Sequence, residues 1–224
     1  MYNITSSNNG SPTIINSIFT GNTAALHGGG ISNENGISPV MLNCTIAGNR
    51  AANGGAVSNR RGVYTSAVTS STLKNCIVWG NSSSIDGSDS ATITNSIVEG
   101  GYPGSNVLNA DPVFVSAESS ANAPTTAGDY HITACSPAAN TGNNTYVIGT
   151  ITLDLDSNAR IAFNTADMGV YELQTEAAPD VNFTGLAGSY CAGSSPVTLT
   201  GIPAGGTFSG TGISDNGNGT AFFD

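Results

Sequence analysis

The sequence predicts an all-β protein, in which a right-handed parallel β-helix (a solenoid of stacked strands) precedes a partial β-sandwich-like segment. Composition is the first reason: Gly supplies 29 of the 224 residues, and only 9% of the residues are charged. Gly, Asn, Ser and Thr, all abundant here, are poor helix formers. The second reason is a short segment that recurs along the first half, and the third is that turn residues separate the strand-length apolar runs.

The recurring segment combines an aliphatic or β-branched pair, an Asn, a Ser or Cys, an apolar pair, and Gly-Asn or Gly-Gly. Its four copies lie at 13–22, 40–49, 72–81 and 92–101. A shorter Gly-rich repeat ending in Asn lies at 29–33 and 55–59. The copies are 27, 32 and 20 residues apart, which fits one solenoid coil with loops of variable size. One short strand buries too little apolar surface alone, so the coils are expected to stack around a shared core.

The Asn inside each repeat is expected to lie at a bend, because Asn tolerates left-handed backbone. Its amide can bond the equivalent amide of the next coil. The candidates for this structural ladder are Asn16, Asn43, Asn75 and Asn95.

The position after the Asn is Ser in the outer copies and Cys44 or Cys76 in the inner ones. Stacking places these two thiols on adjacent turns, within disulfide range. Two small buried free thiols are the favoured interpretation, because in-register side chains rarely meet the dihedral angle of a bridge. A disulfide remains the alternative.

Five further segments follow in order, at 109–114, 128–132, 136–142, 154–160 and 167–172. They read Asn-Ala-Asp-Pro-Val-Phe, Gly-Asp-Tyr-His-Ile, Ser-Pro-Ala-Ala-Asn-Thr-Gly, Asp-Leu-Asp-Ser-Asn-Ala-Arg and Asp-Met-Gly-Val-Tyr-Glu. This order resembles the choice-of-anchor Q domain, although Ser157, Ala159 and Val170 replace the family's usual Gly, Pro and Ala. The resemblance implies the C-terminal continuation of a β-helix in a secreted or surface-displayed bacterial protein, and it assigns no catalytic residue.

The expected organisation is therefore β-helix repeats at 1–105, a choice-of-anchor Q-like end at 106–174, a linker at 175–180 and a truncated module at 181–224. The last part resembles the immunoglobulin-like repeats of bacterial adhesins but is too short for a complete seven-stranded sandwich. Both ends look cut, so we expect a piece of a longer exported chain, and Cys191 is expected to lack a partner here. An uncovered first coil predicts self-association or marginal stability, unless Met1 to Gly10 folds over that end.

The net charge of −10, with only five Lys and Arg, argues against nucleic acid or an anionic membrane surface as partner. No apolar run reaches the length of a membrane span, and no export signal is visible at the N-terminus. The expected location of the whole protein is extracellular or at the cell surface. A polysaccharide or another cell-surface ligand is the expected kind of partner.

Calcium is the one cofactor that the sequence suggests. Asp154, Asp156 and Asn158 have the alternating spacing of oxygen ligands at the start of calcium loops. Ala159 occupies the sixth position, where such loops need Gly, and Thr165 replaces the acidic twelfth residue. The alternative is a turn capped by Asp and Asn, with Arg160 paired to a carboxylate such as Asp167 or Glu172.

The sequence contains little that a catalytic site requires. Its two histidines, His27 and His131, lie in unrelated segments, which gives little support for a metal pair or a catalytic triad. Trp79, together with Tyr64, Tyr102 and Phe114, would form a sugar-stacking platform only on a shared exposed face, and core packing is the simpler expectation.

These observations predict a non-catalytic extracellular segment, either an adhesin or a structural stalk, with glycan as a candidate ligand. The alternative is a carbohydrate-active enzyme, a polysaccharide lyase or glycoside hydrolase, whose catalytic coils are partly missing. An acidic cluster with Arg or Lys on one sheet face would favour the enzyme, whereas a face of Thr, Ser and Asn would favour binding or structure.

Overall fold

The computed structural model describes residues 1–4, 11–61, 67–87, 91–149, 151–175, 182–191, 193–202 and 205–224. The chain divides into two compact units, Met1–Ala177 and Ala178–Asp224, and the expected linker at 175–180 lies outside the described residues except for Thr175. Both units are built from β-strands and irregular segments, which confirms the all-β prediction. Within the described ranges, no helix has the length and apolar character that crossing a bilayer requires.

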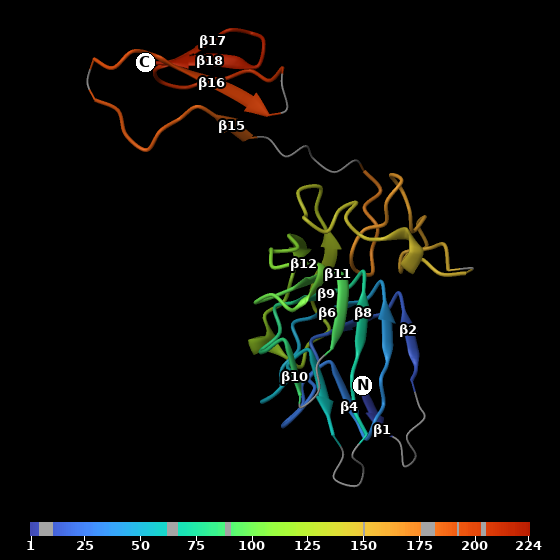
Figure 1. Ribbon diagram of the computed structural model, residues 1–224. Helices are drawn as coiled ribbons and strands as arrows, with labels where there is room; N and C mark the ends of the chain where they lie inside the picture. The colour runs from blue at the N-terminus through green and yellow to red at the C-terminus, as the bar shows by residue number, and fades with distance from the viewer. Residues whose placement is uncertain are drawn as a thin grey trace. The chain divides into compact units, whose positions relative to one another are not determined.

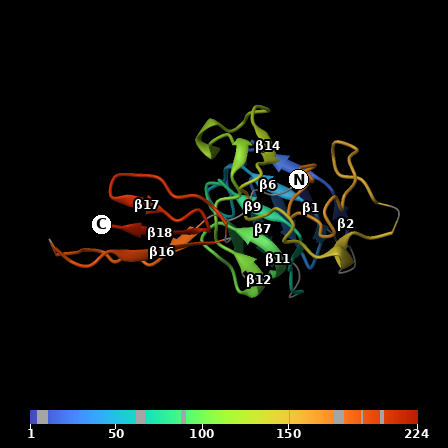
Figure 2. The same ribbon diagram turned by 90° about the horizontal axis from the view of Figure 1, so that it is seen from above.

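The larger sheet of the first unit has eight strands, all paired in parallel, in the order β2-β5-β8-β11-β9-β6-β3 with β12 beside β11. These strands are β2 (Thr13–Ile15), β3 (Ile18–Thr20), β5 (Val40–Leu42), β6 (Thr45–Ala47), β8 (Thr72–Lys74), β9 (Ile77–Trp79), β11 (Thr92–Val98) and β12 (Gly104–Leu108). Figure 1 shows β8 beside β11, and Figure 2 shows β6 beside β9 and β11 beside β12. The sheet is curled, because each repeat enters it as two short strands with a bend between them.

A second parallel sheet runs in the order β1-β4-β7-β10. Its strands are β1 (Tyr2–Ile4), β4 (Ile31–Glu34), β7 (Val57–Arg60) and β10 (Ile85–Gly87). The Gly-rich repeats of the sequence supply β4 and β7, so the two kinds of repeat form two different sheets.

The register of the larger sheet follows the alignment of the repeats. Thr13 pairs with Val40, Val40 with Thr72, and Thr72 with Thr92. The same holds after the bend, where β3 pairs with β6, β6 with β9, and β9 with β11. The predicted side-by-side pairing of successive copies is therefore confirmed.

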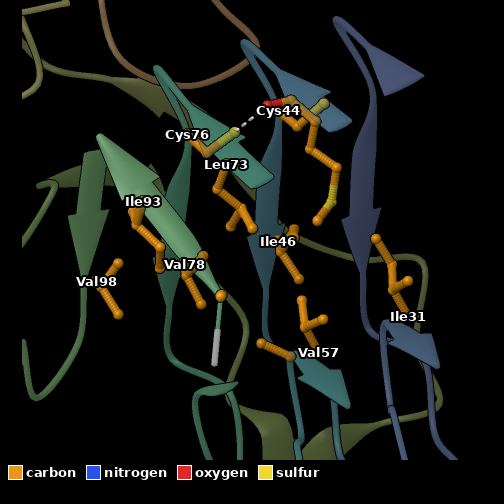
Figure 3. Close-up of a cluster of buried hydrophobic side chains, with 12 residues drawn as sticks. Ile31, Cys44, Ile46, Val57, Leu73, Cys76, Val78, Ile93 and Val98 are labelled. Carbon is orange, nitrogen blue, oxygen red and sulfur yellow. Dashed lines mark hydrogen bonds between the residues drawn. The ribbon is translucent and has the colours of Figure 1, made fainter. Parts of the chain in front are cut away.

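The core of the first unit lies between the two sheets. Ile31 and Val57 come from the smaller sheet, and Ile46, Leu73 and Ile93 from the larger one; all five side chains are buried (Figure 3). Burying one side chain of this size stabilises a fold by about 1.5 to 3 kcal/mol. The two sheets are held together by this shared core rather than by any strand alone.

The small residue after each Asn has the same local role in every copy. Ser17 and Ser96 donate their hydroxyls to the carbonyl two residues earlier, at 2.9 Å in both cases. Cys44 and Cys76 make the same contact through Sγ, at 3.2 and 3.3 Å. Ser and Cys interchange in the repeat because both can donate to a carbonyl freed by the bend.

Residues 109–175 change the architecture. Their described part contains β13 (Phe114–Ser116) and β14 (Asp129–Ile132), which pair antiparallel, and two 3-10 turns, η1 (Ser120–Asn122) and η2 (Asn144–Tyr146). The segment adds no parallel strand among these residues, which differs from the simple continuation that the resemblance implies. It packs against the bends of the larger sheet, where Ile132 and Met168 meet Ile77 and Ile97.

The second unit contains one antiparallel sheet in the order β15-β16-β18-β17. Its strands are β15 (Asn182–Thr184), β16 (Val197–Ile202), β17 (Ile213–Asp215) and β18 (Thr220–Phe223). Leu199 and Ala221 are buried on one face, where Phe208 packs edge-on against Phe183. Among the described residues of this unit there is a single sheet, so the predicted sandwich is represented by one layer.

Candidate functional site

Two rows of hydrogen-bonded asparagines connect successive repeats in the first unit. In the first, which we call the buried row, Asn3 donates to Asn33 at 2.8 Å, Asn33 to Asn59 at 3.0 Å, and Asn59 to Ser71 Oγ at 3.0 Å. Asn33, Asn59 and Ser71 are fully buried. Each amide in the middle of the row therefore accepts one bond and donates another, which satisfies polar groups that would be costly to bury alone.

The second row is formed by Asn22, Asn49 and Asn81, the asparagines of the Gly-Asn pairs. The side chain of Asn22 donates to Asn49 Oδ1 at 2.9 Å, and that of Asn49 donates to Asn81 Oδ1 at 3.0 Å. The amides of Asn49 and Asn81 also donate to the carbonyls of Phe19 and Ile46. The row thus joins each bend both to the next repeat and to a strand backbone.

The four asparagines predicted as the ladder, which we call the bend asparagines, adopt left-handed backbone. Their φ angles are 44° at Asn16, 53° at Asn43, 52° at Asn75 and 46° at Asn95. Only one amide-to-amide bond links them, from Asn75 to Asn43 at 3.0 Å.

Three of the bend asparagines, Asn16, Asn43 and Asn75, also bond backbone groups that lie outside the repeats. Asn16 donates to the carbonyl of Leu153 at 2.6 Å, and Asn43 to that of Tyr146 at 3.1 Å. Asn75 bonds the backbone of Asn143 twice, accepting its N–H at 2.8 Å and donating to its carbonyl at 3.0 Å. These partners lie far away in the sequence, with no period that connects them to the repeat.

The residues of the calcium candidate have separate partners. Asp154 is buried, and its carboxylate accepts the backbone N–H groups of Asp156, Asn158 and Glu172. Asp156 directs Oδ2 to His131. These are the contacts of a turn capped by aspartate. Among the described residues, no group of three or more His, Cys, Asp or Glu side chains is placed to hold a metal ion.

Arg160 is fully buried beside this turn. Its Nη2 donates to the carbonyls of Asp167 and Gly169 at 2.8 and 2.6 Å, and its Nη1 lies 3.6 Å from Glu172 Oε2. The guanidinium therefore ties the end of the first unit together through backbone carbonyls and one carboxylate.

The carboxylates around Arg160 are also bound by backbone amides. Glu172 accepts from Ala162 at 3.1 Å and from Asp167 at 2.9 Å. The carboxylate of Asp167 accepts from Asn140 and Leu173, both at 2.6 Å. Burial raises the pKa of Glu172 to about 7 and also raises the pKa of Asp167. These acids are held away from solvent, where they stabilise turns.

A histidine lies between two carboxylates on the surface of the first unit. His131 Nδ1 lies 2.5 Å from Asp129 Oδ1, and Nε2 lies 2.6 Å from Asp156 Oδ2. The ring stacks on Tyr171, with 3.8 Å between centroids and 21° between planes. We call Asp129, His131 and Asp156 the histidine clamp. The sequence shows each residue, but nothing in it indicates that they meet.

Of the histidine clamp, His131 lines a pocket of about 220 Å³, which is also lined by Asn158, Tyr171 and Gln174. Both ring nitrogens of His131 face carboxylates, so neither is available to take a proton from a nucleophile. His27 lies elsewhere, where it forms an isolated parallel bridge with Asn53.

Arg50 and Lys74 also have structural partners. Arg50 donates to the carbonyls of Ala121 and Ala123, and the Lys74 ammonium lies 4.7 Å from the centroid of the Tyr146 ring. Neither stands over an acidic cluster of the kind that a lyase uses.

The aromatic residues of the possible sugar platform are dispersed. Trp79 and Phe114 pack on one buried cluster and Tyr102 on another, while Tyr64 lies outside the described residues. Core packing thus accounts for the three that are described.

The four cysteines are free thiols. Cys44 and Cys76 are fully buried, and Cys76 Sγ lies 3.5 Å from the carbonyl of Met41 (Figure 3). Cys135 and Cys191 are exposed.

Comparison of the chain with known protein families, curated proteins and solved structures finds no match.

Proposed function

We propose that residues 1–174 form a right-handed parallel β-helix ending in a choice-of-anchor Q-like segment, and that it serves as a non-catalytic stalk or adhesin. On this proposal the chain belongs to a bacterial protein that is secreted or displayed on the cell surface, with glycan as its candidate ligand. The observation that carries the proposal is the pair of asparagine rows. Side-chain bonds between repeats add to the backbone ladder and stiffen the stack along its length.

The use of the polar residues supports a structural role. Three of the bend asparagines bond backbone groups outside the repeats. The cations Arg50, Lys74 and Arg160 contact protein groups. A net charge of −10 keeps such a segment soluble. The second unit, with its single antiparallel sheet, fits the proposal as part of an immunoglobulin-like module.

The test compares binding with turnover. The full chain is incubated with a panel of neutral and acidic polysaccharides, with and without calcium. New reducing or unsaturated ends are measured, together with retention of the protein on the same polysaccharides after immobilisation. The stalk or adhesin predicts no new ends. Retention of the protein on a polysaccharide would indicate an adhesin. No retention on any member of the panel would indicate a structural stalk.

A carbohydrate-active enzyme is the second candidate, and the histidine clamp is the observation that favours it. Asp129 and Asp156 present two carboxylates on either side of His131, which lines a pocket, and paired carboxylates perform glycoside hydrolysis. Turnover that disappears in both Asp129→Asn and Asp156→Asn but persists in Asp86→Asn, an exposed aspartate of β10, would establish this candidate and overturn the first.

A further inference from the structure

The histidine clamp has a geometry that only one protonation state satisfies. Both ring nitrogens of His131 are within hydrogen-bond distance of a carboxylate oxygen. An ionised carboxylate only accepts hydrogen bonds, whereas a neutral imidazole has one N–H and one acceptor nitrogen. The two contacts therefore form together only when His131 is an imidazolium. Loss of its proton leaves one nitrogen lone pair facing a carboxylate.

The clamp joins β14 to the turn 153–159, which is also bonded to the segment 170–172. Asp129 begins β14, Asp156 lies at the tip of the turn 153–159, and Tyr171 lies beyond that turn in the sequence. The base of the turn is held independently, by the bond from Asn16 to the carbonyl of Leu153 and by the antiparallel bridge between Leu153 and Ala159. The tip is exposed, and its contact with His131 ties it to β14.

We propose that the histidine clamp is a pH-operated latch, in which protonated His131 fastens the tip of the turn 153–159 to β14 and neutral His131 releases it. The pocket beside the clamp has His131 on one wall and Asn158, from the turn, on another. Release of the turn therefore separates two of the residues that line this pocket. The latch does not depend on the stalk or adhesin role and would operate equally in an enzyme.

The charges around the ring support this assignment. The groups that face His131 are Asp129 on its own strand, Asp156 on the turn, the ring of Tyr171, and Glu172 in the wall of the adjoining pocket. Within the described lining of that pocket there is no Lys or Arg.

The pKa values of His131 and Asp129 shift in the directions that favour a protonated histidine beside an ionised carboxylate. Partial burial alone lowers the pKa of His131, but the hydrogen bonds to Asp156 and Asp129 outweigh it and raise the pKa above its ordinary value. The hydrogen bond from His131 lowers the pKa of Asp129. The histidine is thus more easily protonated, and its partner more easily ionised, than either would be alone.

The test measures His131 and the turn in the same samples of the full chain. The imidazole is titrated by NMR, and His27→Gln assigns the signals because the chain contains two histidines. Hydrogen exchange then follows the backbone N–H groups of Asp156 and Asn158 below and above the titration midpoint, with correction for intrinsic exchange rates. Both amides donate to Asp154 within the turn, so they report on the order of the turn itself, which we expect to fall when its tip is no longer fastened to β14.

We expect His131 to titrate above its ordinary pKa of about 6.5, and the turn amides to lose protection as the pH rises through that value. Each unit by which the pKa of His131 exceeds its ordinary value corresponds to about a tenfold fall in the ratio of closed to open turn when the proton is lost. His131→Gln should remove the pH dependence. Asp156→Asn should lower the pKa of His131 and reduce protection at low pH, and His27→Gln should change neither.

Two results would overturn the latch. One is a His131 pKa at or below its ordinary value in the wild-type chain. The other is protection of the turn amides that does not change across the titration, or that changes equally in His131→Gln. The side chains of His131 and Asp156 are both substantially exposed, so these variants are expected to fold, and thermal unfolding verifies this.

Discussion

Asn49 and Asn81, 32 residues apart in the chain, are joined by two hydrogen bonds to one oxygen. Asn81 Oδ1 accepts from the side-chain amide of Asn49 at 3.0 Å and from its backbone N–H at 2.9 Å. Asn22 makes the same two bonds to Asn49. The arrangement holds only when the Gly-Asn pairs of neighbouring repeats lie in register, so it specifies the alignment of the repeats as well as stabilising it.

Removal of one amide from the buried row should destabilise the first unit strongly. Asn33 is fully buried, accepts from Asn3 and donates to Asn59. Asn33→Ala leaves a donor and an acceptor unpaired, so we expect the free energy of unfolding to fall by about 2 to 3 kcal/mol. Urea unfolding followed by circular dichroism measures this change.

The control for Asn33→Ala is Asn53→Ala. Asn53 is exposed and its side chain makes one long bond, at 3.4 Å, to the carbonyl of Leu26. This change should cost no more than about 0.5 kcal/mol. Equal losses in the two variants would show that the buried row contributes nothing specific.

The backbone at the bends can be tested separately from the amide bonds. Asn75 has a φ of 52°, a conformation in which a Cβ is unfavourable for most residues. Asn75→Gly and Asn75→Ala both lose the bonds to Asn43 and Asn143, but only Ala retains a Cβ. We expect the Gly variant to be more stable than the Ala variant by about 1 kcal/mol, measured by urea unfolding. The reverse order would argue against a left-handed bend at this position.

The sequence predicted the parallel pairing of the repeats because their apolar pairs recur with the turns. It predicted left-handed bends at Asn16, Asn43, Asn75 and Asn95 because Asn is common in that conformation. It did not distinguish which asparagines bond one another. Asn33 and Asn49 repeat as regularly as Asn43, and repetition alone does not reveal which side chains turn toward the next coil.

The contacts between distant segments were not predictable in the same way. Asn16 meets Leu153 across 137 residues, and Asn75 meets Asn143 across 68. Neither Leu153 nor Asn143 belongs to a repeat, so no period links the partners. The histidine clamp was missed for the same reason: Asp156 was considered as a metal ligand, but its bond to His131 depends on how an irregular turn packs on β14.

Serine should replace cysteine in the repeat with little loss. Cys44 Sγ donates to the carbonyl of Leu42, and serines at the equivalent positions make the same bond. Cys44→Ser is therefore expected to cost less than about 1 kcal/mol. Cys44→Ala loses the donor and leaves a small void, and should cost about 1 to 2 kcal/mol. Thermal unfolding at one pH compares the two, and a more stable Ala variant would contradict the assigned hydrogen bond.

The thiol content distinguishes free cysteines from a bridge between coils. The structure has four free cysteines, with Cys44 and Cys76 buried in the core. Titration with a thiol reagent should therefore give four thiols per chain after denaturation without reductant, and fewer in the folded chain because buried thiols are protected. A count of two after denaturation would establish a disulfide instead.

The stability of the first unit should fall as the pH rises from about 4.5 to about 7. Burial raises the pKa of Glu172 from 4.5 to about 7 in the folded chain. In this pH range the folded state therefore holds a proton that the unfolded state has lost. The linkage relation then makes the free energy of unfolding decrease with pH, by up to about 3 kcal/mol from this residue.

Glu172→Gln provides the comparison for this pH dependence. The variant cannot ionise, so its stability should change less between these pH values, although it is less stable overall because an amide has only one oxygen to accept from Ala162 and Asp167. His131 contributes with the same sign, since its stabilisation is complete below its unfolded pKa and is lost as the pH rises through its raised folded pKa. The double variant with His131→Gln should therefore be flatter still. Wild-type stability that rises over this range would show that Glu172 is ionised in the fold and that Arg160 outweighs the effect of burial.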